Sequence, residues 1–220
     1  MKLTSIPSKL IILLISVFLI SAVIYYFSIE EADIPQMTVQ EKKARFKTLI
    51  IPAVNDVYAE LMAQYQEISA SIDAQKNSQQ IEKLKVEYKA TTNDELLMAL
   101  KPHPKSIAIA QAAMESAWAT SRFFREANNI FGVWSFDEDE PRIAALQKRG
   151  DKTIWVKKYS SVKAAVKDYY RTLGRSSAFK EFRELRMQSN DPFLLVTKLD
   201  RYSEKGAEYG HELTSIIKFN

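Results

Sequence analysis

The sequence contains no cysteine, only two histidines (His103 and His211) and only five glycines among its 220 residues. Without cysteine, the chain forms no disulfide and offers no thiolate nucleophile or thiolate metal ligand. Two histidines far apart in the chain do not make a His-rich metal cluster, so we expect no metal site and no cofactor. Both histidines are expected at the surface. The chemistry that remains open relies on carboxylates, tyrosine hydroxyls and amides.

A strong excess of one charge sign is also lacking. The chain has 31 Lys and Arg against 27 Asp and Glu, a formal net charge of +4. The basic residues are interleaved with acidic ones, as in residues 82–87 (EKLKVE). Nucleic-acid binding needs basic residues clustered on one face, so we do not expect it. The small surplus suits an anionic polymer without requiring one.

One long apolar segment stands at the N-terminus. Residues 10–27 (LIILLISVFLISAVIYYF) carry no charge, and as a helix they would reach about 27 Å, close to the thickness of a hydrocarbon core. Lys2 and Lys9 precede this run and acidic residues follow it, so we expect residues 1–9 in the cytoplasm and the rest outside. A cleavable signal peptide ending near Ser21 and Ala22 is the alternative, although the apolar run continues beyond them.

The remainder of the sequence is typical of a mainly α-helical protein with one small β-hairpin. Residues 28–37 form a linker, residues 96–220 a second domain, and residues 38–95 a helical juxtamembrane region that packs partly on that domain. Apolar periodicity and breaking residues predict helices over 38–72 (kinked or divided by Pro52), 79–88, 93–100, 107–127, 161–173 (stopped by Gly174), 177–187, 192–199 and 205–219. The hairpin is expected from residues 142–147 and 153–159 around the turn 148–151.

Glu115 is the unusual residue of the predicted helix 107–127, which is otherwise rich in alanine. A carboxyl group among small apolar side chains loses hydration, which raises its pKa and keeps its proton near neutral pH. A general acid that protonates a glycosidic oxygen must be such a protonated carboxyl group. The alternative at this point is an ordinary ion pair, for instance with Arg122.

Four segments carry a resemblance to a known family. Residues 109–118 (IAQAAMESAW), 129–133 (NIFGV), 159–161 with 168–169 (YSS and DY), and Tyr202-Ser203 with Tyr209 resemble, in order, motifs of the glucosaminidase-type peptidoglycan hydrolases of glycoside hydrolase family 73. The variant details are most similar to its bacterial Bax-type branch. The resemblance implies a lysozyme-like α+β domain behind the membrane helix, and cleavage beside N-acetylglucosamine in the cell-wall glycan. It also implies a single-pass protein of the bacterial inner membrane whose domain is periplasmic.

The resemblance assigns roles to individual residues. Glu115 matches the general acid and Tyr202 a functional tyrosine. A second carboxylate, which some members carry on the hairpin, is missing from residues 142–147, so Glu138 or Glu140 of the preceding acidic loop are the candidates. The expected substrate-binding residues are Gln111, Trp118, Asn129, Phe131, Trp134 and Tyr159. Retention, inversion and assistance by the substrate's own acetamido group all stay open.

Two other functions remain possible from the sequence. One is a wall-binding protein without catalysis on the same fold, consistent with the missing hairpin glutamate. The other is a tethered interaction protein that uses residues 38–88 as a coiled-coil arm, although no sustained heptad is present. The expected partners are peptidoglycan glycan strands and, through residues 10–27, the membrane. The oligomeric state is left open.

Overall fold

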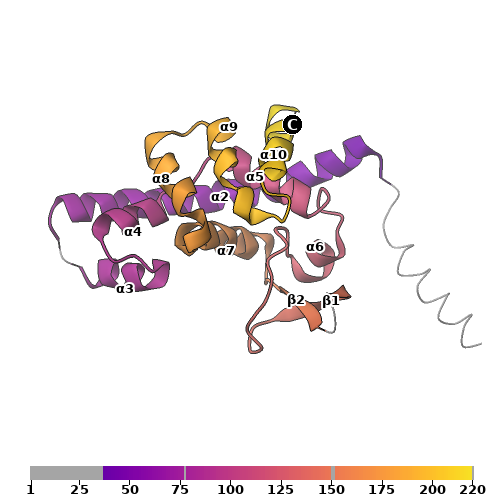
Figure 1. Ribbon diagram of the computed structural model, residues 1–220, viewed down its shortest axis with the longest axis horizontal. Coiled ribbons are helices and arrows are strands. Elements are labelled where there is room, and N and C mark those ends of the chain that lie inside the picture. The colour runs from indigo at the N-terminus through magenta and orange to yellow at the C-terminus, as the bar shows by residue number, and fades with distance from the viewer. Residues whose placement is uncertain (1–36, 77, 150–151, 220) are drawn as a thin grey trace, which may run out of the picture. The chain divides into compact units, whose positions relative to one another are not determined.

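The computed structural model describes residues 37–76, 78–149 and 152–219. The apolar run 10–27 and most of the linker therefore lie outside the described residues. Among the helices that are described, none is both long enough and apolar enough to cross a membrane. Residues from Val39 onward form one unit of helices with a two-stranded sheet at its edge (Figure 1).

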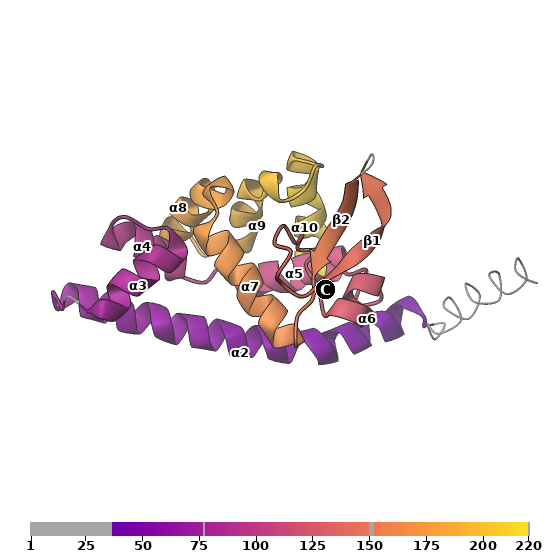
Figure 2. The ribbon, with the colours of Figure 1, turned by 90° about the horizontal axis from the view of Figure 1, so that it is seen from below.

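Helix α2, Val39–Asp73, is a single helix of 35 residues that runs along one side of this unit (Figure 2). Its buried residues recur every three or four positions and are Phe46, Ile50, Val54, Val57, Leu61 and Ile68. The prediction of a helix here is confirmed, but Pro52 does not divide it. The stripe continues on both sides of Pro52, so tertiary packing offsets the hydrogen bond that proline cannot donate.

Two short helices cover the C-terminal end of α2. They are α3, Gln79–Tyr88, capped by the Ser78 hydroxyl, and α4, Asn93–Leu100, capped by the Thr92 hydroxyl. Thr92 caps α4 because its side-chain oxygen accepts a hydrogen bond from the Glu95 backbone N–H. Their apolar faces join the end of α2 in a small separate core of Ile68, Ile81, Leu84, Tyr88, Leu96, Ala99 and Leu100.

The predicted continuous helix 107–127 is wrong. Helix α5 runs Lys105–Glu115 and helix α6 runs Arg122–Ala127, and between them Ala117, Trp118 and Ala119 all have positive φ angles, of 49°, 61° and 61°. The Ser116 hydroxyl donates to Ala112 O and accepts from Ala119 N. The first bond adds to the helical bond from Ser116 N to Ala112 O, and the second gives the Ala119 N–H an acceptor where α5 has ended.

Contacts with α2 stabilise this irregular segment. The Trp118 ring packs edge-on against Phe46 with centroids 5.2 Å apart, and Lys43 lies over its face. Arg45 Nη1 donates to Ala119 O at 3.0 Å. The alanine-rich sequence favours continued helix, and the partners on α2 outweigh that local preference.

The hairpin is confirmed, with shifted ends. Strands β1, Arg142–Arg149, and β2, Lys152–Lys157, pair antiparallel with an irregularity between Ala144 and Lys148. The segment before them joins the other edge of β2, since Ser135 N donates to Trp155 O and Lys157 N to Val133 O. Trp134 therefore lies beside Val156 of the sheet.

The C-terminal part wraps around the core. Helix α7, Val162–Arg175, crosses α2, and after it come η1 (Ser177–Phe179), α8 (Lys180–Gln188), α9 (Pro192–Leu195), η2 (Val196–Lys198), η3 (Asp200–Tyr202) and α10 (Ala207–Phe219) (Figures 1 and 2). Ser161 and Asp191 cap α7 and α9 as their sequence positions indicate. Gly174 lies inside α7 and does not stop it. In the main core, α2 residues from Phe46 to Leu61 pack with those of α5, α7 and α10.

The expected surface position of His103 is wrong. Its side chain has no exposed surface and stacks on Tyr170 with ring centroids 4.4 Å apart. Burial lowers the pKa of His103 to about 3, with the nearby Arg186 charge contributing, so the ring is neutral at physiological pH. His211 is exposed as expected. His103 lies between Pro102 and Pro104, outside the predicted helices, so the periodicity of apolar residues did not indicate its burial.

Replacing Gly174 with alanine tests why this glycine stands inside a helix. In most helices that change raises stability by roughly 0.5–1 kcal/mol. Here a Cβ would lie 2.8 Å from Ala99 O and 3.0 Å from Tyr88 Cε1, so we expect Gly174→Ala to lower the free energy of unfolding by about 1–3 kcal/mol. Denaturant unfolding measures the change. A stabilised variant would contradict the close packing of α4 on α7.

Candidate active site

Glu115 is the last residue of α5 and lies half-buried below an open cleft. Its Oε1 accepts a hydrogen bond of 2.9 Å from the Tyr209 hydroxyl on α10. Burial raises the pKa of the Glu115 carboxyl and Glu212 adds to that rise, while the Tyr209 hydrogen bond and the Lys205 charge oppose it. Desolvation is the largest of these effects, so the group retains its proton to higher pH than an ordinary glutamic acid.

A chain of buried hydrogen bonds fixes the Tyr209 hydroxyl. The Tyr169 hydroxyl donates to Gln111 Oε1 at 2.5 Å, and Gln111 Nε2 donates to the Tyr209 oxygen at 2.8 Å. Gln111 lies one turn before Glu115 on α5, so the two side chains share a helix face. The Tyr209 oxygen already accepts from Gln111, and its proton therefore points at Glu115. The donor and acceptor of each hydrogen bond in this series are therefore defined, and the last acceptor is the Glu115 carboxyl group.

The cleft consists of two adjoining cavities of about 550 Å³ and 400 Å³. Four residues line both, namely Glu115, Gly132, Trp134 and Ile154. The first cavity extends along Ser121, Arg122, Phe123, Ala145, Leu146 and Val156, and the second along Phe131, Tyr202 and Glu204. The wall supplied by the hairpin is thus apolar and the opposite end is polar. The combined shape is an open groove that suits an extended ligand.

The loop after α6 places Gly132 directly beside the carboxyl group. Asn128 ends α6 in the left-handed conformation, and the buried Asn129 side chain bonds Val133 N, Val133 O and Lys157 O. Gly132 has φ +64°, and a Cβ there would lie 3.8 Å from Glu115 Oε2. A residue with a side chain would be strained in this conformation, so the glycine lets the loop approach the site.

The structure brings some of the predicted site residues together and not others. Trp134, whose side chain is 42% exposed, and Tyr202 line the cleft with Glu115. Phe131 also lines it but is buried, with its ring stacked on Tyr169 at 3.9 Å. Gln111 lies behind the carboxyl group, where it holds the Tyr209 hydroxyl.

Besides Gln111, three other predicted substrate-binding residues are not among those that line the cleft. Trp118 packs on α2, because the chain leaves the helix after Glu115 and turns this ring away from the Glu115 side. The Asn129 side chain forms hydrogen bonds with the backbone of Val133 and so stabilises the Gly132 loop. The Tyr159 hydroxyl donates to Asp168 Oδ2 at 2.8 Å and so joins the segment after β2 to α7.

The two candidates for a second carboxylate also fail to reach the cleft. Glu138, whose side chain is 89% exposed, pairs with Arg142 at 3.6 Å, and Glu140 pairs with Lys157 at 3.1 Å. Neither is among the described residues that line the cavities. The acidic loop turns toward its own hairpin, whose cations attract it. Glu204 is the carboxylate that the structure adds beside Glu115, and its nearness to Tyr202 in the sequence was the available signal.

No group of three or more His, Asp or Glu residues is placed to hold a metal ion within the part of the chain that the structure describes. What the arrangement offers chemically is one proton-bearing carboxyl group, a hydroxyl bonded to it, and an open groove with an exposed aromatic ring at its edge.

Glu115→Gln tests the buried carboxyl group through stability. The raised pKa means that the folded protein holds the proton more tightly than the unfolded chain, so ionisation at neutral pH costs stability. We expect the variant to have the higher free energy of unfolding at pH 7, with the difference vanishing below about pH 4, near the ordinary pKa of glutamic acid. Urea unfolding at several pH values measures this.

The matched control is Glu138→Gln, which removes a carboxylate that is 89% exposed and should leave the pH dependence unchanged. If Glu115→Gln gave a curve parallel to the wild type, the carboxyl group would be an ordinary exposed acid.

Comparison with known proteins gives the family. The sequence model described as mannosyl-glycoprotein endo-beta-N-acetylglucosaminidase (Glucosaminidase) matches residues 95–220. Protein bax of Escherichia coli (strain K12) is 31% identical over 123 residues, which are 53% of this chain and 43% of that protein. The chain therefore matches less than half the length of this curated relative.

Solved structures of low similarity were also found. The C-terminally truncated glycoside hydrolase domain of Salmonella typhimurium FlgJ is 22% identical, with a TM-score of 0.42, over 61% of this chain and 91% of that one. The catalytic domain of the autolysin Auto from Listeria monocytogenes is 16% identical, with a TM-score of 0.48, over 88% and 92%. The family match covers more than half of the chain, from α4 to the C-terminus, and the chain therefore belongs to the glucosaminidase family, described as mannosyl-glycoprotein endo-beta-N-acetylglucosaminidase.

Proposed function

We propose that the chain is a peptidoglycan hydrolase of the endo-β-N-acetylglucosaminidase type, with a lysozyme-like domain and Glu115 as general acid. The observation that carries the proposal is a half-buried carboxyl group with a raised pKa in an open groove, bonded to the Tyr209 hydroxyl. A glycan strand is an extended ligand, which the adjoining cavities suit. Family membership supports the same reaction class.

Glu115 donates its proton to the glycosidic oxygen as the bond from that oxygen to the anomeric carbon breaks. The carboxylate left behind is stabilised by the Tyr209 hydroxyl, which already points at Oε1. Gln111 and Tyr169 hold that hydroxyl in place, so little reorganisation is needed when the charge develops. Water completes the hydrolysis at the anomeric carbon, and Glu115 recovers a proton.

Glu204 is the residue we propose as the second carboxylate, in place of Glu138 and Glu140. It lines the same cavity as Glu115 and Tyr202. In that position it can activate the water or stabilise the positive charge of the sugar ring. Assistance by the acetamido group of the substrate is the alternative, in which Glu204 has no role in bond cleavage.

Tyr202 and Trp134 contact the sugar in this proposal. Burial holds the pKa of Tyr202 well above its ordinary value, so the phenol is neutral, and its hydroxyl donates to Phe131 O at 3.2 Å. Tyr202 therefore offers its oxygen as an acceptor and its ring as a wall. Trp134 presents an exposed ring on which a pyranose face can stack. The Phe131 ring stacks on that of Tyr169 and so supports it.

Glu115→Gln and Glu204→Gln separate these roles. On purified peptidoglycan we expect Glu115→Gln to lower turnover by at least about 100-fold, the usual contribution of a general acid. Glu204→Gln should lower it by at least about tenfold if a protein carboxylate acts at the anomeric carbon. Release of soluble fragments gives the rate, and mass spectrometry of the new reducing ends identifies the bond.

Glu138→Gln is the control and should retain full activity. Unchanged activity of Glu204→Gln would assign the second role to the substrate's acetamido group. If the folded wild-type protein bound peptidoglycan without cutting it, the domain would be a wall-binding module, and the proposed activity would be wrong.

We also propose that residues 10–27 anchor the chain in the bacterial inner membrane, with residues 1–9 in the cytoplasm and the domain in the periplasm. The support is the length of the apolar run and the charges on either side of it. Protease added to spheroplasts should digest the domain and spare a tag placed at residue 1. A mature protein beginning near residue 23 would show that the segment is a cleaved signal peptide.

A further inference from the structure

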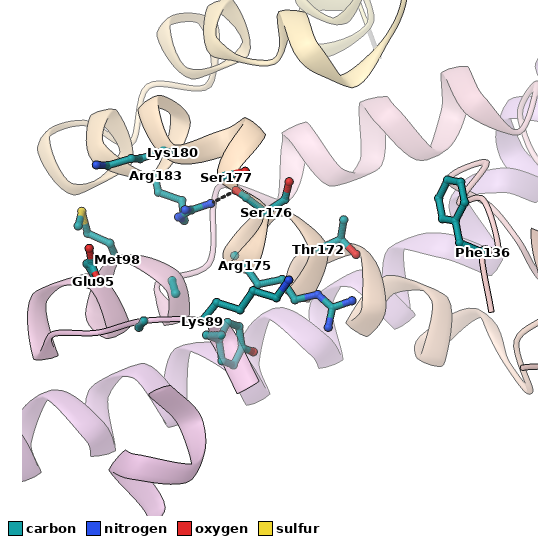
Figure 3. A pocket seen from close by; sticks show the side chains of 14 residues that line it. Lys89, Glu95, Met98, Phe136, Thr172, Arg175, Ser176, Ser177, Lys180 and Arg183 are labelled. Carbon is teal, nitrogen blue, oxygen red and sulfur yellow. Dashed lines mark hydrogen bonds between the residues drawn. The ribbon is translucent and has the colours of Figure 1, made fainter. Parts of the chain in front are cut away.

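A further cavity, separate from the cleft, lies between the ends of several helices. It measures about 680 Å³ and is lined by the end of α3, by α4, by the C-terminal end of α7 and by α8 (Figure 3). Four cations line it, namely Lys89, Arg175, Lys180 and Arg183, together with the hydroxyl-bearing residues Thr172, Ser176 and Ser177. We call this cavity the basic groove.

The positive charge of the basic groove exceeds what the fold needs. The C-terminal end of α7 carries a partial negative charge of about half a unit. Arg183 already meets it, since Nη1 donates to Leu173 O at 2.9 Å and to Ser176 O at 2.7 Å. The carboxylate among the lining residues, Glu95, accepts hydrogen bonds from the backbone N–H and hydroxyl of Thr91 and also interacts with the charge of Lys180. Four cations therefore line the groove against one carboxylate, and part of the positive charge is not balanced there.

Lys89, Arg175 and Lys180 supply that unbalanced charge. Lys89 adopts the left-handed conformation where α3 ends, with φ 56°. Among the described residues, no carboxylate lies within ion-pair distance of Lys89 or Arg175, and Lys180 has only a 3.8 Å contact with Glu184. Lys89 and Arg175 are both among the side chains that line the groove in Figure 3. Their positions suit an anionic group that both contact.

The rest of the lining gives the size and character of the ligand. Met98, Ala90 and Ala99 add apolar surface to the cations and hydroxyls. A volume of about 680 Å³ lies within the range of sites for small organic ligands and exceeds what a single small anion fills. A short peptide with free carboxylates combines these properties, because guanidinium and ammonium groups bind carboxylates while the apolar surface accepts its side chains.

The groove also reaches toward the cleft. Phe136, which is among its lining residues, lies with its ring centroid 6.2 Å from that of Trp134, and Trp134 lines the cleft with Glu115. A branched ligand could thus place one part in each cavity. Peptidoglycan has this form, with a sugar backbone and peptide branches that end in carboxylates.

We propose that the basic groove binds the carboxylate-bearing peptide branches of the wall glycan whose sugars occupy the cleft. The inference rests on the proposed function for the identity of the ligand. Lys89 and Arg175 bind a carboxylate, and Lys180 with the Ser177 hydroxyl adds contacts along the branch. The groove thereby selects glycan strands that still carry their peptides.

The test uses a synthetic stem tetrapeptide with free carboxylates, titrated into the full-length protein in detergent and followed by calorimetry. We expect saturable binding that the double variant Lys89→Gln/Arg175→Gln weakens by at least tenfold. The same peptide with its carboxylates amidated should bind at least tenfold more weakly to the wild type. Arg175→Lys, which keeps the charge, should retain most of the affinity and shows that any loss is not one of folding.

The matched control is Lys83→Gln/Arg201→Gln, which removes two exposed cations that are not among the residues lining the groove. It should bind the tetrapeptide as the wild type does. On peptidoglycan, the groove variant should raise the KM with little change in kcat, and on peptide-free glycan strands it should match the wild type.

Several results would overturn the proposal. Tetrapeptide binding that is absent, or equal in the groove variant and the wild type, would do so even if the wall is digested. Tighter binding of phosphatidylglycerol vesicles than of the tetrapeptide, lost in the groove variant, would instead identify a site for anionic lipid. Peptide binding without any glycan cleavage would support the groove and contradict the hydrolase activity, so the two failures can be told apart.

Discussion

A carboxyl group that loses hydration must be protonated or hydrogen-bonded, and the organisation of this site depends on that requirement. Glu115 meets it in both ways, through a raised pKa and through the Tyr209 hydroxyl. The hydroxyl can serve only because Gln111 and Tyr169 fix its direction from within the core. Residues of α5, α7 and α10 are therefore joined by hydrogen bonds that end at the Glu115 carboxyl group. These bonds lie among the apolar contacts of the same helices.

The end of α5 at Glu115 is the second determining feature. Where a continuous helix would have kept the following residues on the α5 axis, the three left-handed residues redirect the chain, so that Trp118 packs on Phe46 of α2. The long helix α2 thus helps to position the site by holding the segment that comes after the carboxyl group. The Gly132 loop, which the Asn129 side chain holds in shape, also approaches the carboxyl group.

Much of the local structure could be predicted from the sequence. The apolar stripe of α2, the bounds of α3, the hairpin and the caps at Ser161 and Asp191 depend on periodicity and on neighbouring residues. The break after Glu115 and the burial of His103 could not be predicted in this way, because their causes are partners distant in the chain. For the same reason the acidic loop was a reasonable source of a second carboxylate until its ion pairs with Arg142 and Lys157 were visible.

The sequence by itself determined the helical class, the family and the one carboxyl group set among alanines, because these depend on composition, spacing and short motifs read along the chain. Only the tertiary structure decided which side chains meet. It placed Tyr209, far along the chain, on the Glu115 carboxyl, put Glu204 in the cleft, and gathered Lys89 with Arg175 and Lys180 at one groove. Hydration loss, hydrogen-bond direction and the balance of charges are properties of neighbours in space, and the order of residues along the chain does not specify them.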